Sequence, residues 1–268
     1  MNKSNRIKEI VKEKYGQIAQ KSSNQCCCSC NCSDSAQTTE NSIMAESYLN
    51  IGGYVPEADL GLGCGIPTKY AGIKAGDTVV DLGSGTGNDV FIARQLVGEA
   101  GHVIGIDMTS EMIKQAEKHN NKLGFKNVEF KLGEIEKLPL ENNSAHVIVS
   151  NCVLNLVPDK PKAFAEIFRV LKPGGHFCVS DIVMNGQFPE SLIHIAELYV
   201  GCVAGAISQN EYIDIIKKSG FDNITIHDES NITLLPEVLE NYLPKDEIQV
   251  YLDSKTEIKS LTVTAYKK

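Results

Sequence analysis

Nine cysteines are the most chemically distinctive side chains of this 268-residue chain, and they are unevenly distributed. The stretch NQCCCSCNCSD holds five of them within seven positions: Cys26, Cys27, Cys28, Cys30 and Cys32. The other four stand far apart in sequence, as Cys64, Cys152, Cys178 and Cys202. Thiolates are nucleophiles and ligands of soft centres, so these sulfurs raise the question of a thiolate site.

The composition indicates the compartment and excludes some partners. The N-terminal stretch MNKSNRIKEIVKEKYGQIAQ lacks the apolar core of a signal peptide, and no apolar run is long enough to span a bilayer. We therefore expect a cytoplasmic protein with no membrane partner, in which the thiols stay reduced. A net charge of -8, with lysines and carboxylates interleaved, argues against a nucleic-acid partner.

The cysteine-dense stretch lies in a segment, Lys21 to about Ser42, that is rich in Ser, Asn, Gln and Thr. Apart from its cysteines it nearly lacks apolar side chains, so burial cannot offset the entropy of ordering it. Its thiols could bind zinc or copper(I), but the two-plus-two ligand spacing of a zinc finger is missing. We expect a mobile thiol segment here rather than a structural metal site.

A glycine loop marks a second candidate site. The stretch VVDLGSGTGND places Gly83, Gly85 and Gly87 directly after an apolar run and ahead of an amphipathic helix. Glycine permits a sharp turn and a close approach of the backbone to a ligand. Asp107 ends the next apolar run, where its carboxylate can accept hydrogen bonds from a ribose diol. Together these features predict a nucleoside-binding site.

The details of this loop favour S-adenosylmethionine over NAD. The dinucleotide fingerprint is G-x-G-x-x-G, whereas the third glycine here comes one position earlier. Asp81 stands at the mouth of the turn, where a carboxylate repels a pyrophosphate and attracts an ammonium group. S-adenosylmethionine carries an ammonium group and a ribose but no phosphate.

Around this loop, apolar runs and amphipathic stretches alternate. We expect strands in TVVDLG, HVIGID, NVEFKLG, AHVIVSN and HFCVSDI, with intervening helices such as the one for which Ser110 is a plausible N-cap. Strands that alternate with helices imply an α/β fold, a Rossmann-like parallel sheet covered on both faces. After Asn185 the alternation loosens, and DNITIHD and SLTVTAYKK predict two further strands.

Three segments follow from this pattern. Residues 1–75 form an N-terminal helix and a cysteine-containing leader, residues 76–184 the S-adenosylmethionine-binding domain, and residues 185–268 a C-terminal α+β cap with the last strands. The helix, from Arg6 to Gln20, places Ile7, Ile10, Val11 and Ile18 on roughly one face.

DLGSGTG, GID and LKPGG resemble the motifs of Rossmann-like, class I S-adenosylmethionine-dependent methyltransferases, from about Gly76 to Ile182. The resemblance implies a cofactor site in which the residue after the second-strand acid and the loop after the third strand border the adenine. The residues so implied are Asp81, Gly83, Ser84, Gly85, Thr86, Gly87, Asp107, Met108, Glu134 and Ile135. Asn151, at the end of the fourth strand, is a further candidate for cofactor contact.

The isolated cysteines differ in context. Cys178 lies inside a predicted strand, where a small apolar core residue is the expected role. Cys152 follows the fourth strand, where ligands bind in such sheets. Cys64 in GLGCGIP and Cys202 in YVGCVAGA adjoin glycines and alanines that would let a bulky centre approach the backbone.

The stretches GLGCG, VSNCVLNLVPDK with the preceding GEIEKL, and GCVAGA resemble the arsenite methyltransferases, from about Tyr48 to Phe221. The resemblance implies that Cys64, Cys152 and Cys202 bind trivalent arsenic, a soft centre suited to thiolates. It implies a fourth, N-terminal redox cysteine, here assigned to Cys32.

The implied activity is methylation of arsenite or methylarsenite by S-adenosylmethionine, for arsenic detoxification, with thioredoxin or glutathione as reductant. Two alternatives stay open: C- or O-methylation of another small molecule, and non-enzymatic metalloid binding by thiols.

Overall fold

In the computed structural model, residues 3–24, 48–186, 205–232, 240, 244–254 and 256–268 are described. They contain a seven-stranded sheet of order β3-β2-β1-β4-β5-β7-β6. The strands are β1 Thr78–Leu82, β2 His102–Asp107, β3 Val128–Leu132, β4 Ala145–Asn151, β5 Leu171–Asn185, β6 Asp222–Ile232 and β7 Glu257–Tyr266. The α-helices are α1 Lys3–Asn24, α2 Pro67–Tyr70, α3 Asn88–Val97, α4 Ser110–Leu123, α5 Lys160–Val170, α7 Gln209–Lys218 and α9 Lys245–Asp253. Two short 3-10 turns, η1 Pro56–Ala58 and η2 Leu154–Leu156, complete the regular elements.

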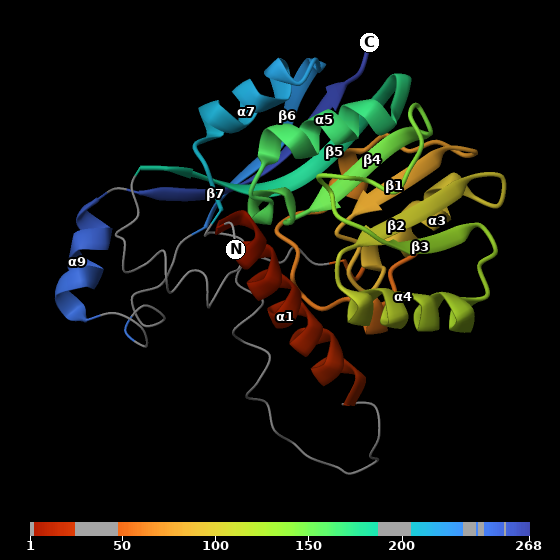
Figure 1. The fold of residues 1–268 in the computed structure, drawn as a ribbon, viewed down its shortest axis with the longest axis horizontal. Helices are drawn as coiled ribbons and strands as arrows, with labels where there is room; N and C mark the ends of the chain where they lie inside the picture. Colours follow the sequence, from red (N-terminus) through yellow and green to blue (C-terminus); the bar gives the residue numbers. More distant parts are fainter. Residues whose placement is uncertain (1–2, 25–47, 187–204, 233–239, 241–243, 255) are drawn as a thin grey trace.

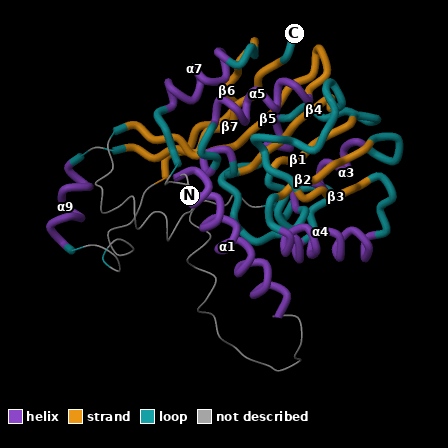
Figure 2. Tube along the Cα trace, in the orientation of Figure 1, coloured by secondary structure: helices purple, strands orange, loops and turns teal. Residues whose placement is uncertain are grey.

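The topology confirms the predicted α/β fold and all seven predicted strands. Strands β1 to β5 run parallel, while β7 is antiparallel to both of its neighbours, β5 and β6. Figure 2 shows the strands of this sheet in orange. The chain leaves β1 toward β2 on one side and later returns beside β1 with β4. In open α/β sheets such a reversal opens a crevice at the carboxyl ends of the strands.

Alternating strand residues supply two apolar layers. Val80 and Leu82 of β1 face one layer, which is covered by α5 and α7 through residues such as Phe164 and Tyr212. Val79 faces the other layer, which is covered by α3. Strands β1, β2 and β4 are therefore buried on both faces, as their nearly continuous apolar runs indicate.

Two local predictions are wrong. Ile10 of α1 is 50% exposed, so it lies off the buried face of that helix. Ser110 is the first residue of α4 rather than its N-cap, and the N-cap Thr109 makes no side-chain capping bond. The backbone N–H of Thr109 donates instead to the Asp107 carboxylate at 2.8 Å. That carboxylate therefore stabilises the turn between β2 and α4.

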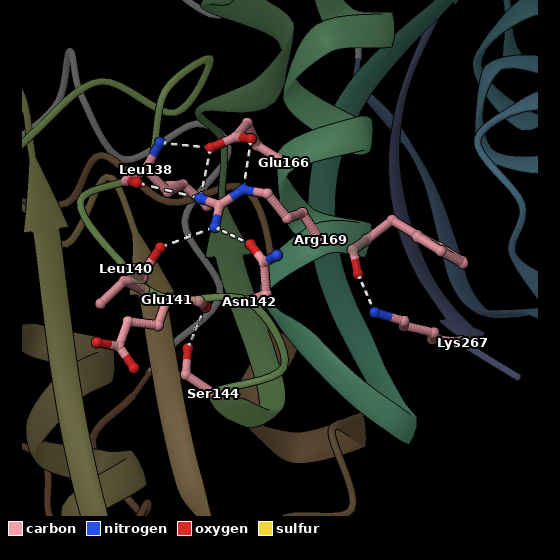
Figure 3. A network of polar contacts seen from close by, with 9 residues as sticks. Leu138, Leu140, Glu141, Asn142, Ser144, Glu166, Arg169 and Lys267 are labelled. Carbon is pink, nitrogen blue, oxygen red and sulfur yellow. Dashed lines mark hydrogen bonds and ion pairs between the residues drawn. The ribbon is translucent and has the colours of Figure 1, made fainter.

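The loop between β3 and β4 is anchored on α5 by Arg169 (Figure 3). The guanidinium donates to both carboxylate oxygens of Glu166, at 2.7 and 2.8 Å, and to the carbonyls of Leu138 and Leu140, at 3.2 and 2.8 Å. Glu166 also accepts the Leu138 N–H at 2.8 Å. The bidentate pair within α5 fixes the orientation of the guanidinium, and the bonds to the Leu138 and Leu140 backbone hold the loop against the helix.

Among the helices that the structure describes, none is both long enough and apolar enough to pass through a membrane.

Candidate active site

A pocket opens at the carboxyl ends of β1, β2 and β4, at the reversal in strand order. Its wall contains ten of the eleven predicted cofactor residues: Asp81, Gly83, Ser84, Gly85, Thr86, Asp107, Met108, Glu134, Ile135 and Asn151. Gly87 does not line the pocket. It is instead the N-cap of α3, with a φ of 103°. A Cβ added at Gly87 would lie 2.8 Å from the Phe91 ring, so this glycine permits close packing.

The glycine loop reaches its shape through backbone angles that favour glycine. Gly83 and Gly85 have φ values of 70° and 51°. A Cβ added at Gly83 would fall 2.4 Å from the side chain of Val153, which follows Cys152. The loop after β1 and the turn after β4 are therefore packed against each other, and this contact fixes the relative position of the two sides of the pocket.

Buried carboxylates concentrate negative charge beside this loop. Burial, then the charges of Asp89 and Asp107, raise the pKa of Asp81 well above its usual value. Burial likewise raises the pKa of Asp89 to about 6. Within the described part of the chain, none of these three carboxylates forms an ion pair. Such a cluster stabilises a cationic ligand, which removes the repulsion among the carboxylates.

Two buried polar atoms of the pocket wall are unsatisfied. Ser84 Oγ and Asn88 Oδ1 have no hydrogen-bond partner among the described residues. Buried polar atoms without partners are uncommon in folded proteins, and a bound ligand is one way to satisfy them. Asp107 already accepts the N–H groups of Gly85 at 3.0 Å and Thr109 at 2.8 Å, which orients its carboxylate toward the pocket that it lines.

Asn151 brings Cys64 and Cys152 together. Its side-chain oxygen accepts the Cys64 N–H at 3.0 Å, and its amide nitrogen donates to the Gly65 carbonyl at 2.8 Å. Cys152 follows Asn151 directly and lines the pocket. Both cysteines are buried, although they come from distant parts of the chain.

Hydrogen bonds to the backbone hold both cysteines in place. Cys152 has a φ of 60°, rare for a non-glycine residue, and its N–H donates to the Ser180 carbonyl at 2.7 Å. The Cys64 carbonyl accepts from the Ser260 hydroxyl.

The remaining cysteines fall in different places. Cys178 is fully buried in the core layer next to α3, as predicted, and burial raises the pKa of its thiol. Cys32 and Cys202 lie outside the described residues. Gly205 follows Cys202 by three positions, and a Cβ added at Gly205 would lie 1.8 Å from the Asn155 carbonyl oxygen. The end of the GCVAGA stretch thus lies against the turn that follows Cys152.

Two polar networks were missed from the sequence. In the first, the Tyr48 hydroxyl donates to Asp89 at 3.1 Å and accepts from the Asn151 amide at 2.7 Å. Asp89 could be seen in the sequence as the acidic residue directly after the glycine loop, whereas no local sequence pattern indicates a role for Tyr48. In the second, Asp181 accepts the Tyr212 hydroxyl at 3.0 Å, and burial raises the pKa of Asp181 to about 7.

Comparison with known proteins gives a consistent assignment. The methyltransferase domain family matches residues 73–220. The arsenite methyltransferase of Halobacterium salinarum is 38% identical over 93% of this chain and 65% of its own length. That of Aquipseudomonas alcaligenes is 32% identical over 88% of this chain and 68% of its own length.

A solved structure agrees. CrArsM, an arsenic(III) S-adenosylmethionine methyltransferase from Chlamydomonas reinhardtii, superposes with a TM-score of 0.65 at 36% identity. The superposition covers 76% of this chain and 67% of that one. The chain spans about two thirds of these relatives and 40% of the Homo sapiens arsenite methyltransferase. On this similarity, the chain belongs to the arsenite methyltransferase family.

Proposed function

We propose that this protein methylates trivalent arsenic, as arsenite or methylarsenite, with S-adenosylmethionine as methyl donor. The observation that carries the proposal is the Asn151 clamp, which holds the Cys64 segment beside Cys152 at the edge of the pocket. A methyltransferase for a carbon or oxygen acceptor has no need of two buried thiols at this edge. Membership of the arsenite methyltransferase family supports the same substrate.

The pocket fits S-adenosylmethionine. Asp81 and Asp107 line the pocket, and we assign Asp81 with its neighbouring carboxylates to the ammonium group and Asp107 to the ribose diol. Met108, Glu134 and Ile135 line the part of the wall that we assign to the adenine. When bound, the cofactor supplies an electrophilic methyl group on a sulfonium sulfur.

The protein's contribution to the chemistry is alignment. Three thiolates bound to trivalent arsenic leave its lone pair directed away from the sulfurs, and this acceptor carries no proton, so no general base is required. Holding the acceptor at a fixed position beside the pocket can supply roughly 7–11 kcal/mol of barrier reduction. We assign the thiolates to Cys64, Cys152 and Cys202.

The third ligand is supported by chain length. Three residues span at most about 11 Å, so Cys202 is within reach of the turn against which Gly205 lies. Cys152 stands three residues before Asn155 in that turn. A thiolate from each of three segments would convert the described cysteine pair into a tripodal site.

Electron balance requires the oxidation of two thiols, and a fourth cysteine besides the three proposed ligands can supply one of them. Transfer of a methyl cation formally oxidises arsenic by two electrons, and two thiolates that form a disulfide return them. We propose Cys32 as one partner, with thioredoxin or glutathione reducing the disulfide in the cytoplasm.

The test combines product analysis with ligand binding. Reduced protein is incubated with arsenite, S-adenosylmethionine and a thioredoxin system, and arsenic species are separated and quantified. We expect Cys64→Ala and Cys152→Ala to lower the rate by about 100-fold or more, because misplacement of one reactant by about 1 Å has that effect. Cys178→Ala is the matched control and should remain active.

The outcomes separate the alternatives. Absence of methylated arsenic from the wild-type reaction would refute the proposal. A protein that binds arsenite but not S-adenosylhomocysteine would be a non-enzymatic thiol binder. Full activity toward a carbon or oxygen acceptor in the Cys64→Ala variant would identify another small-molecule methyltransferase.

A further inference from the structure

The N-terminal helix α1 supplies part of the pocket wall. Lys8, Val11 and Tyr15 line the pocket, and their spacing of three and four residues places them on one face of the helix. The side chain of Lys8 is 21% exposed, whereas Ile10 beside this face is 50% exposed. Figure 1 shows α1 in red, outside the sheet.

The first half of α1 is joined to the loop after β3. The Lys8 ammonium group donates to Glu134 at 2.8 Å and forms a second ion pair with Glu136. The hydrogen bond from Lys8 holds the pKa of Glu134 below its usual value. Both glutamates line the pocket, so Lys8 connects the helix to the wall that we assign to the adenine.

The second half of α1 lies against α4. A Cβ added at Gly16 would lie 3.6 Å from a Glu111 carboxylate oxygen and 3.8 Å from the Thr109 methyl group. Further along, the Gln115 amide donates to the Ala19 carbonyl. The helix therefore bridges two elements on either side of the adenosine end of the pocket.

We propose that α1 is a lid on the adenosine end of the cofactor site, that Val11 and Tyr15 contact the bound nucleoside, and that Lys8 is the positioning residue that fastens the lid. This inference rests on the proposed S-adenosylmethionine site. A terminal helix docked against a domain can open locally without unfolding the sheet. Cofactor entry and product release then follow opening of α1.

Chemistry favours a nucleoside beneath this helix. The Tyr15 ring offers an apolar surface with a polar edge, a combination suited to a flat purine. Lys8 neutralises two carboxylates that would otherwise stand unpaired beside a ligand of low polarity. Glycine at position 16 allows the helix to approach Thr109, which lines the pocket directly after Met108.

Hydrogen exchange of the full chain tests the lid directly. With S-adenosylhomocysteine bound, amides of α1 should exchange more slowly, while those of the β6–β7 edge, which does not line the pocket, should not change. Calorimetry with the same ligand compares Tyr15→Ala with Ile10→Ala, an exposed position on the same helix. We expect the dissociation constant to rise about tenfold for Tyr15→Ala, a change of about 1.4 kcal/mol, and to stay constant for Ile10→Ala.

Dissociation kinetics test Lys8. Lys8→Met keeps the alkyl stem and removes both ion pairs, so the ligand should dissociate faster, whereas Lys8→Arg should restore the slower rate. Wild-type protein that does not bind S-adenosylhomocysteine would refute the proposed cofactor site itself. Binding with unchanged exchange in α1, and with equal affinities for the Tyr15→Ala and Ile10→Ala variants, would refute the lid alone.

Discussion

Replacement of Asn151 by alanine tests the structural basis of the thiol site without removing a sulfur. In the structure its side chain accepts the Cys64 N–H at 3.0 Å and donates to the Gly65 carbonyl at 2.8 Å. It also donates to the Tyr48 hydroxyl at 2.7 Å. Alanine leaves the chain path of β4 unchanged but releases the Cys64 segment from the strand that ends beside Cys152.

The size of the effect follows from the groups that lose their partner. The buried Cys64 N–H becomes unsatisfied, at a cost of about 1–3 kcal/mol, whereas the Gly65 carbonyl can still accept from the Tyr48 hydroxyl at 3.1 Å. The segment can relieve this cost by moving away from β4 toward water, and that movement separates the two thiols. If the conformation with both thiols in place is destabilised by about 1.4–2.8 kcal/mol relative to the displaced one, arsenite affinity decreases by about 10- to 100-fold.

Titration calorimetry of reduced protein with arsenite measures this affinity, and product analysis measures the methylation rate. Asn127→Ala is the matched control. The Asn127 amide donates to two backbone carbonyls, of Gly98 at 2.8 Å and Gly101 at 2.7 Å, and it does not line the pocket. Its loss should lower the thermal midpoint to a similar extent and leave arsenite affinity unchanged. Equal arsenite affinities in wild type and Asn151→Ala would show that the clamp does not position the thiols.

Three further outcomes are expected. Arg169→Ala should lower the free energy of unfolding by about 2–3 kcal/mol, because the Leu138 and Leu140 carbonyls lose their donor, and denaturant titration measures this. Burial raises the pKa of Asp181 to about 7, so the folded state retains a proton that the unfolded state loses above about pH 4. The free energy of unfolding should therefore fall between pH 4 and 7 by a few kcal/mol more in wild type than in Asp181→Asn. Denaturant titration of both proteins at pH 5 and pH 7.5 measures this fall, and an equal fall in the two proteins would contradict the prediction. Gly83→Ala should weaken S-adenosylhomocysteine binding at least tenfold, as calorimetry measures it, because the added Cβ would clash with Val153. Gly72→Ala is the control and should leave binding unchanged, because Gly72 also has a positive φ but has open space around it.

The fold could be predicted because its signals are local. Strands β1, β2 and β4 are short apolar runs, and each is bounded by turn residues or by the start of an amphipathic helix. The glycine loop and Asp107 were identifiable because the geometry of a nucleotide-binding turn constrains consecutive residues. Gly87 shows the limit of this approach, since its neighbours Phe91 and Phe130 explain its conformation better than a ligand does.

The thiol site could be predicted only in part. The motifs around Cys64 and Cys152 pointed to these two cysteines as candidates, but the residue that connects their segments acts across the fold. Asn151 was considered as a cofactor contact, yet its oxygen is engaged by the Cys64 N–H and its nitrogen faces three acceptors. Tyr48 could not be predicted, because its partners come from α3 and β4, and their proximity depends on tertiary packing.

This packing also links the two halves of the site. Asp89 lies in the first turn of α3, directly after the glycine loop, and its carboxylate accepts from the Tyr48 hydroxyl and from the Asn151 amide at 3.2 Å. The same amide group holds the Cys64 segment. A cationic ligand near Asp81 would lower the pKa of Asp89 by relieving the repulsion between buried carboxylates, and a charged Asp89 accepts these two hydrogen bonds more strongly. Cofactor binding should therefore stiffen the arrangement that positions the thiols, so that arsenite binds more tightly to the cofactor-bound protein than to the free one, and the reverse holds by linkage.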